Sequence, residues 1–224
     1  MASFNAAIRV RPGPAADRQI NEIREVFAQR AMPFVWWVTP RDSDDGLEAK
    51  LRAHGFGYGD EESIGMAVSL IGRAGPSPAR KSLSVARIFE VSDIRTWFAT
   101  LLGSSERTVD DATMDLATTV YSHLSNDRHS GWQLYLAYMD DRPVGTCALH
   151  TGRAAGLYAV GTLPMARRRG VGIALTNQAL ADAASAGHRI ATLTASGLGE
   201  RLYRTLGFRE YCRFREYVWR PTEG

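Results

Sequence analysis

The sequence predicts an α/β fold in which helices flank a mixed β-sheet. Two strand-like segments, residues 133–138 and 144–149, are separated only by a short polar turn, which is typical of an antiparallel hairpin. A strand over 156–163, a helical pattern over 171–186 and a strand over 189–194 then follow one another. A crossover of this kind joins parallel strands through a right-handed connection. The sheet is therefore expected to contain both antiparallel and parallel pairs.

The first part of the chain, residues 1–73, predicts the order helix, strand, helix, strand. Apolar residues recur at helical spacing after Asp17, which we expect to cap the first helix. The segments that follow are a strand over 34–38, a helix that carries Leu47 and Leu51 and ends at Gly55, and a strand over 65–70.

Residues 72–80 are rich in glycine, proline and small side chains and have no periodic apolar face, so they predict a linker. We divide the chain into an N-terminal region (1–73), a linker (74–83) and a C-terminal domain (84–224).

The C-terminal domain begins and ends with further elements around the hairpin and the crossover. Before the hairpin we expect a strand over 85–89, a helix from Ser92 or Asp93 to Leu101, and a helix over 111–124. After the crossover we expect a short helix that ends at Gly207 and a final strand rich in aromatic residues up to Trp219.

The composition is that of a globular protein, with 45% hydrophobic and 23% charged residues in 224. The longest apolar stretches, such as Phe34–Val38, are far shorter than the roughly 18 residues of a membrane span. The start of the chain lacks the basic and apolar segments of a secretory signal, so we expect a cytoplasmic protein. Cys147 and Cys212 are then expected to be buried free thiols.

The sequence from Arg167 to Gly172, Arg-Arg-Arg-Gly-Val-Gly, lies between the predicted strand and the predicted helix of the crossover. The first turn of a helix has unpaired backbone N–H groups and the positive end of the helix dipole, which together bind phosphate. Gly170 and Gly172 let the backbone approach such an anion closely. A solvated basic turn is the alternative. No Lys-Ser/Thr pair follows the glycines, so the segment is not a P-loop.

The segment Val160–Gly172 resembles the acyl-CoA motif of GNAT superfamily N-acetyltransferases, Arg/Gln-x-x-Gly-x-Gly/Ala, with Arg167, Gly170 and Gly172 at the defining positions. The segment Ala195–Phe208 is similar to a later block of that family, in which Leu-Tyr-x-x-Leu-Gly-Phe is common. The resemblance is strong from about residue 133 to residue 219. It implies a mostly antiparallel sheet with a central parallel pair of strands that splay apart.

The resemblance also implies a set of residues that bind acetyl-CoA. Backbone groups of Val160 and Thr162, on either side of Gly161, would bind the pantetheine arm between the splayed strands. The pyrophosphate would lie on backbone N–H groups of the loop and first helical turn, formed by Arg168, Arg169, Gly170, Val171, Gly172 and Ile173. Ser196 occupies a position where the family often has a residue that contacts the cofactor, although a turn or capping serine is the alternative.

The implied reaction is direct attack of an amine on the thioester, without a covalent enzyme intermediate. Tyr203 matches the tyrosine that protonates the departing thiolate in such enzymes, and a core aromatic is the alternative for this residue. No general base is assigned, although His150 and Glu200 are nearby candidates. The histidines and cysteines lack metal-ligand spacing, so no metal site is expected.

Two other functions remain open at this point: a non-catalytic acyl-CoA-binding module, and a basic protein that binds nucleic acid. The net charge of +3 suits either a polynucleotide or a small polyanion, and we favour the small polyanion. The acceptor amine is open, and a homodimer is compatible with the sequence. The order strand, helix, Gly-Phe over residues 36–56 recurs over 190–208, which suggests that the N-terminal region is a reduced second copy of the fold.

Overall fold

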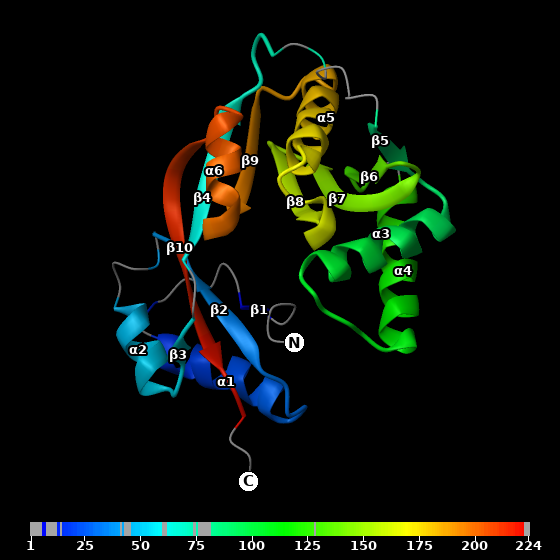
Figure 1. Cartoon of the computed structure of the whole chain (residues 1–224). Coiled ribbons are helices and arrows are strands. Elements are labelled where there is room, and N and C mark those ends of the chain that lie inside the picture. Colours follow the sequence, from blue (N-terminus) through cyan, green and yellow to red (C-terminus); the bar gives the residue numbers. More distant parts are fainter. Residues whose placement is uncertain are drawn as a thin grey trace. The chain divides into compact units, whose positions relative to one another are not determined.

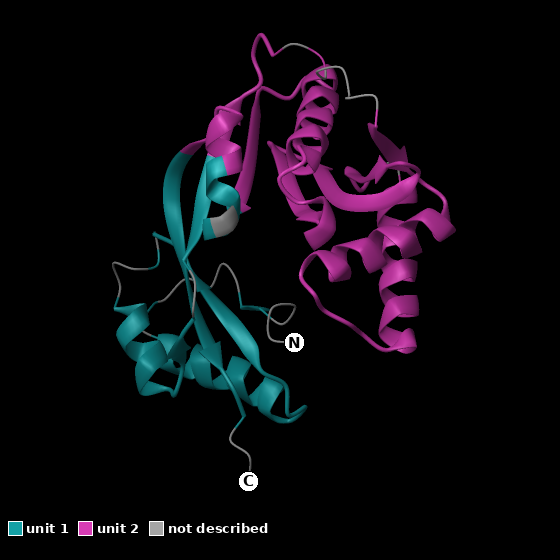
Figure 2. Cartoon of the chain, viewed as in Figure 1, with its two compact units in different colours: residues 1–66, 195–201, 210–224 teal, residues 67–194, 202–209 magenta. Residues whose placement is uncertain are grey.

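The computed structural model describes residues 6–7, 13, 15–40, 42, 46–59, 62–73, 75, 82–127 and 129–221. The described chain contains both helices and strands (Figure 1). The chain forms two compact units (Figure 2), of which unit 1 comprises residues 1–66, 195–201 and 210–224, and unit 2 comprises residues 67–194 and 202–209. The predicted linker lies mostly outside the described residues, and the predicted domain limits stay a prediction. No helix in the described part of the chain is long and apolar enough to cross a bilayer.

Unit 1 packs short helices against a small sheet. Strand β2 pairs parallel with β1 and antiparallel with β10, and β10 also pairs antiparallel with β3. The elements are β1 (Ala6–Ala7), α1 (Ala16–Ala28), β2 (Phe34–Val38), α2 (Leu47–Ala53), β3 (Gly57–Tyr58), the first part of β4 (Ser63–Ser69) and most of β10 (Arg209–Trp219).

The core of unit 1 follows from the two-residue period of β2. Phe34, Trp36 and Val38 are buried on one face of the strand, together with Ile20 of α1, Leu47 and Leu51 of α2, Phe56 and Tyr217. Trp37, on the other face, packs instead against Phe214 of β10, with ring centroids 5.9 Å apart. The two adjacent tryptophans therefore lie on opposite faces of β2.

Unit 2 contains the hairpin and the crossover that the sequence predicts. Its strands lie in the order β9-β8-β7-β6-β5, in which β8 and β9 are parallel and the other neighbours antiparallel. The elements are β5 (Leu83–Ile88), α3 (Val91–Ser104), α4 (Asp111–Asn126), β6 (Trp132–Met139), β7 (Arg142–Thr151), β8 (Ala155–Thr162), the 3₁₀ turn η3 (Pro164–Ala166), α5 (Val171–Ser185), β9 (Ile190–Ala195) and part of α6 (Gly197–Thr205). The mixed, mostly antiparallel sheet is confirmed.

The two faces of the unit 2 sheet are covered by different helices. Leu134 and Leu136 of β6 belong to the buried cluster that Trp97 of α3 joins. Tyr135, between them, points to the opposite face, where its hydroxyl donates a 2.7 Å hydrogen bond to Asp182 of α5. The turn between β6 and β7 has positive φ at both Asp140 (50°) and Asp141 (60°), as a type I′ hairpin requires.

Helices α2 and α6 end in the same way, as the recurring Gly-Phe pattern suggests. Gly55 (φ 82°) and Gly207 (φ 89°) occupy the left-handed C′ position. The next residues, Phe56 and Phe208, are buried, and each donates its N–H to a carbonyl five residues earlier at 3.0 Å. The two helix ends therefore share one local geometry, and the repeat suggested for the N-terminal region stays a prediction.

One predicted helix start is wrong. Asp17 does not cap α1, which begins at Ala16 with Ala15 in the cap position. Asp17 lies in the first turn, where its carboxylate bonds to Lys50 and, at 3.1 Å, to His54 of the α2 end. These bonds lower the pKa of Asp17 below its ordinary value. Asp17 therefore links α1 to α2 through its carboxylate. A local capping pattern does not reveal partners that are so distant in sequence.

Strand β8 contains a β-bulge opposite Cys147. The pairing of β7 with β8 shifts between Thr146, which lies opposite Gly161, and Ala148, which lies opposite Tyr158. Ala159 has a φ of 49° inside this bulge. The hydroxyl of the fully buried Thr146 donates a 2.9 Å hydrogen bond to the Ala159 carbonyl. On the other side, the indole N–H of Trp97 donates to the Cys147 carbonyl at 3.2 Å. Two side chains therefore hold the bulge.

Replacing Thr146 with valine should lower the free energy of unfolding by about 1 to 3 kcal/mol, because the shape is kept while the Ala159 carbonyl loses its donor. Urea denaturation measures this. Thr100→Val is the matched control, since the Thr100 hydroxyl donates to the Thr96 carbonyl of its own helix. Equal losses in both variants would show that the bulge does not depend on the Thr146 hydroxyl.

Candidate functional site

The segment between β8 and α5 forms a loop whose backbone is open to an anion. After the 3₁₀ turn η3, Arg168 (φ 60°) and Gly170 (φ 89°) adopt left-handed conformations, and Gly170 caps α5. The first bond of the helix runs from the Ala174 N–H to the Gly170 carbonyl at 3.0 Å. Within the described part of the chain, the helix therefore supplies no acceptor for the N–H groups of Val171, Gly172 and Ile173. These groups and the helix dipole favour a phosphate.

The two loop glycines are needed for different reasons. A Cβ on Gly170 would meet no atom within 4 Å, so space remains beside this residue and only its positive φ demands glycine. A Cβ on Gly172 would lie 2.9 Å from the Cδ1 atom of Leu202, so the end of the Leu202 side chain would have to shift. Gly172 therefore allows the first turn of α5 to approach Leu202 and, with it, the part of α6 that carries Tyr203.

The three arginines of the loop have unequal roles. The guanidinium of Arg167 donates to the Ser104 carbonyl at the end of α3 (2.8 Å) and to the Thr162 carbonyl at the end of β8 (3.4 Å). Arg168 and Arg169 are exposed. Arg167 thus joins the loop to two other elements, whereas the other two side chains extend toward solvent.

Strands β8 and β9 pair only at their first residues. The parallel register covers Ala155 to Leu157 of β8 and Ala191 to Leu193 of β9. The rest of β8 up to Thr162 has no register with β9, and Figure 1 shows the two strands diverging. Val160, Gly161 and Thr162 lie in this diverging part, and the bulge at Ala159 lies where it begins. The strand splay that the resemblance implies is present.

Tyr203 is 8% exposed and lies on α6, with its ring edge-on to Phe208 at 5.7 Å between centroids. Burial, and to a lesser extent the neighbouring Cys147, raises the pKa of Tyr203 above its ordinary value. Its hydroxyl therefore stays protonated at neutral pH. Within the described residues it has no hydrogen-bond partner, so its proton is available to a bound group.

The remaining sequence candidates are less closely tied to this arrangement. Ser196 is exposed and follows β9 directly, and its carbonyl accepts the N–H groups of Gly199 (2.9 Å) and Glu200 (3.1 Å) at the start of α6. It belongs to unit 1 and stays a sequence-based prediction. The ring of His150 packs on Trp132 at 4.9 Å. Among the described residues, no group of three or more His, Cys, Asp or Glu side chains is arranged to hold a metal ion.

Sequence reasoning missed three residues that shape the loop and strand. Thr146 holds the bulge, the Ser104 carbonyl accepts the Arg167 guanidinium, and Leu202 lies against Gly172. Each is distant in sequence from its partner. Leu202 was inside the recognised block, but Thr146 and Ser104 carry no pattern that would have singled them out.

Comparisons with known proteins agree with this geometry. Residues 130–210 match the family model described as acetyltransferase (GNAT) domain. No curated protein sequence matches the chain. Among solved structures, the chain is similar to a GCN5-related N-acetyltransferase from Kribbella flavida, with a TM-score of 0.69 and 21% identity over 98% of this chain and 81% of that one.

Two further structures have the same fold. A GCN5-related N-acetyltransferase from Sphaerobacter thermophilus matches with a TM-score of 0.70 and 18% identity, over 93% of this chain and 70% of that one. A tandem GNAT protein from the clavulanic acid biosynthesis pathway matches with a TM-score of 0.63 and 16% identity, over 91% of this chain and 69% of that one. Residues 130–210 therefore match a GNAT acetyltransferase domain, and the likeness to these structures shows that the chain has the same fold.

Proposed function

We propose that the protein transfers an acetyl group from acetyl-CoA to a primary amine of a small molecule or peptide, with Tyr203 as the general acid. The observation that carries this proposal is the coincidence of the diverging β8–β9 pair with the unpaired N–H groups at the start of α5. Together they offer an extended strand edge for an amide-bearing arm and a helix end for its phosphates.

The residues of β8 and the loop have complementary tasks in binding acetyl-CoA. The strand edge at Val160 and Thr162 would pair with the two amides of the pantetheine arm, as an added strand does. The N–H groups from Arg168 to Ile173 would hold the pyrophosphate. Space beside Gly170 supports this assignment, because no described side chain fills it.

The chemistry proposed for the site requires one proton donor. The amine nitrogen attacks the acetyl carbonyl carbon and loses one proton to solvent, and collapse of the tetrahedral intermediate breaks the bond to sulfur. The Tyr203 hydroxyl gives its proton to the departing thiolate and regains one from solvent. A backbone N–H in the diverging part of β8 would stabilise the oxyanion. Tyr203 suits this role because its hydroxyl carries a proton at neutral pH and has no hydrogen-bond partner among the described residues. We assign no general base.

The N-terminal region shares a helix-end geometry with the C-terminal domain but lacks the residues proposed for the site. Tyr203 lies five residues before the buried Phe208, and the corresponding position before the buried Phe56 is occupied by Leu51. Helix α1 has Ala15 rather than a left-handed glycine at its cap. We therefore propose that acetyl-CoA binds only in the C-terminal domain.

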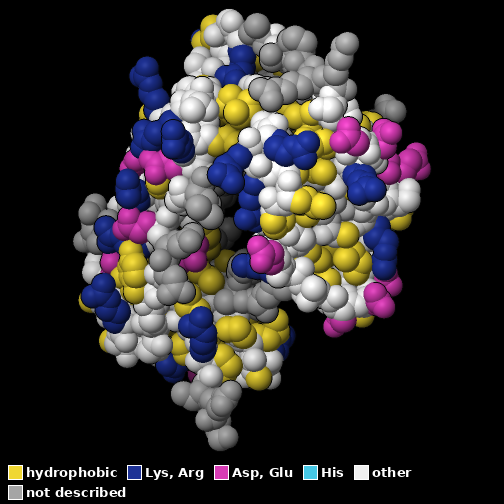
Figure 3. All heavy atoms as spheres, in the orientation of Figure 1, with side chains coloured by type: hydrophobic (Ala, Val, Ile, Leu, Met, Phe, Trp, Pro, Cys, Tyr) yellow, Lys and Arg dark blue, Asp and Glu magenta, His cyan; other side chains and the backbone are white. Residues whose placement is uncertain are grey.

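A non-catalytic acyl-CoA-binding module is the second candidate, because the loop alone could bind the cofactor without using Tyr203. Nucleic-acid binding has less support. On the face shown in Figure 3, basic and acidic side chains are interspersed with apolar ones, which does not favour a polyphosphate backbone. A cytoplasmic location and a homodimer stay predictions.

Acetyl-CoA should raise the thermal midpoint of the protein, because a ligand that binds only the folded state stabilises it. Gly170→Ala should weaken acetyl-CoA binding at least about tenfold, measured by isothermal titration calorimetry, because the methyl group would occupy the space beside the loop.

Gly187→Ala is the matched control for this variant. Gly187 lies at the other end of α5, with a φ of 88° and nothing within 4 Å of an added Cβ. Both substitutions should cost about 1 to 2 kcal/mol of stability through backbone strain, but only Gly170→Ala should affect affinity. An unchanged affinity in Gly170→Ala would refute the loop assignment. No thermal shift at all would exclude both acyl-CoA functions.

Tyr203→Phe should lower kcat about 10²- to 10⁴-fold while leaving acetyl-CoA affinity intact, because only the proton donor is removed. Release of free thiol with a panel of amines measures turnover. The pKa of Tyr203 is raised above its ordinary value of 10.0. Ionisation of Tyr203 should therefore cause no loss of activity in the parent protein below pH 10.0.

Tyr211→Phe is the control, because Tyr211 is 74% exposed on β10. Full turnover in Tyr203→Phe would remove the general-acid assignment. Acetyl-CoA binding without turnover in the parent, across the whole amine panel, would favour the non-catalytic module.

A further inference from the structure

The parallel strands β8 and β9 have one buried face and one open face. Leu157 of β8 and Leu193 of β9 are opposite each other in register and are only 3% and 7% exposed. On the other face, Tyr158 is 51% exposed, and Thr192 and Thr194 are exposed as well. The register ends at the Leu157–Leu193 pair, so Tyr158 and Thr194 flank the start of the gap between the strands on the open face.

The proton donor of the proposed reaction lies on the buried side of the sheet. Leu157 pairs with Leu149 of β7, which shares its face with Cys147, two residues earlier. Cys147 pairs in turn with Tyr135, whose hydroxyl is bonded to α5. Cys147 is also the neighbour that helps to raise the pKa of Tyr203. The open face is therefore the side from which an acceptor can reach the gap without displacing Tyr203 or α5.

Three aromatic side chains from neighbouring strands meet on the open face. The ring centroid of Trp132 on β6 lies 4.9 Å from that of His150 on β7 and 5.3 Å from that of Tyr158 on β8. The Trp132 ring is tilted by 47° and 50° to its two neighbours, so the rings do not cover one another face to face. Trp132 and His150 are partly exposed. We call these three residues the aromatic platform.

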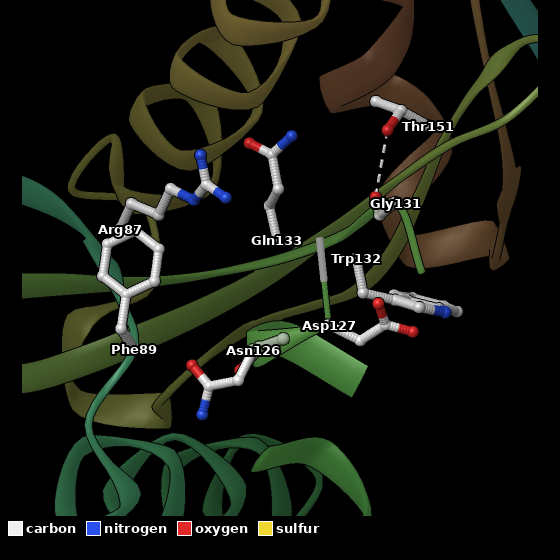
Figure 4. A pocket seen from close by; sticks show the side chains of 9 residues that line it. Arg87, Phe89, Asn126, Asp127, Gly131, Trp132, Gln133 and Thr151 are labelled. Carbon is white, nitrogen blue, oxygen red and sulfur yellow. Dashed lines mark hydrogen bonds between the residues drawn. The ribbon is translucent and has the colours of Figure 1, made fainter. Parts of the chain in front are cut away.

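Two glycines fix the ends of the aromatic platform. A Cβ on Gly156 would lie 2.7 Å from Cε2 and 2.9 Å from the hydroxyl oxygen of Tyr158, so the Tyr158 ring lies over Gly156 and has its other side in solvent. Gly131, directly before Trp132, has a φ of 71°. Its carbonyl accepts the Thr151 N–H at 2.9 Å and the Thr151 hydroxyl at 3.1 Å (Figure 4). Rings held in this way lose little freedom when a ligand packs on them.

The end of α3 closes the open face beyond Tyr158. Tyr158 pairs with Ala148, and Gly161 pairs with Thr146, so Tyr158 and Gly161 lie on the same face of the sheet. A Cβ on Gly161 would lie 2.3 Å from the hydroxyl oxygen of Ser104 at the end of α3. The aromatic platform therefore ends where β8 and β9 diverge, and a ligand on it can extend only into the gap.

We propose that the aromatic platform holds the acceptor, and that this acceptor is a primary amine joined to an aromatic ring by a short alkyl chain. The inference rests on the acetyl transfer proposed above. The ring of the amine stacks on Tyr158 beside Trp132, and the nitrogen extends toward Val160. Residues two apart on a strand are separated by about 7 Å. A two-carbon chain, together with an approach distance of roughly 3 Å to the carbonyl carbon, covers this length.

The side chains of the open face favour an aromatic amine over a polyamine. Its five side chains carry aromatic rings or hydroxyl groups and no carboxylate: Trp132, His150, Tyr158, Thr192 and Thr194. A second ammonium group would have no acidic partner among them. A saturated ring of the same size would fill the same space but would lose the stacking between π-systems.

Isothermal titration calorimetry of the full chain tests this recognition with three amines. Phenethylamine should bind saturably, cyclohexylethylamine should bind at least about threefold more weakly, and putrescine at least about tenfold more weakly. The first two amines differ only in the aromaticity of the ring. Absence of saturable phenethylamine binding would overturn the inference, as would equal binding of cyclohexylethylamine.

Variants of the aromatic platform locate the amine. Tyr158→Leu should weaken phenethylamine binding at least about threefold and bring it close to that of cyclohexylethylamine. Gly156→Ala should weaken it too, because the added methyl group displaces the Tyr158 ring, but it should have little further effect in a Tyr158→Leu background. Tyr211→Leu, at a residue 74% exposed on β10, is the control. Unchanged phenethylamine affinity in Tyr158→Leu would exclude the aromatic platform as its site.

Turnover separates this inference from the proposed function. Thiol release from acetyl-CoA should have a kcat/KM at least about threefold higher with phenethylamine than with cyclohexylethylamine, and Tyr158→Leu should remove the difference while leaving acetyl-CoA affinity unchanged. Equal turnover of the two amines would overturn the inference and leave the acetyl transfer standing. Tyr158-dependent binding of phenethylamine without thiol release would instead overturn the acetyl transfer and support the aromatic platform as an amine site.

Discussion

The structure of the candidate site depends on the point at which β8 stops pairing with β9, after Leu157. Up to there the two strands form an ordinary parallel pair, and beyond it their edges are free for a ligand. The bulge at Ala159 sets this point, because the extra residue bends the strand. Thr146 of β7 and Trp97 of α3 each donate a hydrogen bond at the bulge. The packing of the unit 2 core therefore also determines the geometry of the candidate site.

The backbone and the side chains of the loop before α5 have different roles. A run of three arginines suggests three cationic side chains around an anion, but the Arg167 guanidinium is bound to two carbonyls. In the proposed site, the anion would therefore contact mainly the N–H groups from Arg168 to Ile173, beside the left-handed Gly170. Backbone groups are less tolerant of displacement than long side chains are, which makes the conformation of Gly170 more important than the number of arginines.

Local patterns predicted much of this protein, and distant contacts account for what they missed. The hairpin turn at Asp140, the helix ends at Gly187 and Gly207 and the loop before α5 each depend on residues close together in sequence. Asp17 was misread as a cap because its partners Lys50 and His54 lie on another helix. Thr146 and Ser104 were not foreseen for the same reason.

The contacts of Arg167 have a consequence for the rate and cost of binding. Its guanidinium fastens the loop to the ends of α3 and β8 through bonds that involve no ligand. If the proposed pyrophosphate binds here, the loop would already hold much of the required shape, and little conformational entropy would be lost on binding. Binding of this kind needs no slow rearrangement of the loop, so association can be governed by diffusion and charge rather than by folding of the site.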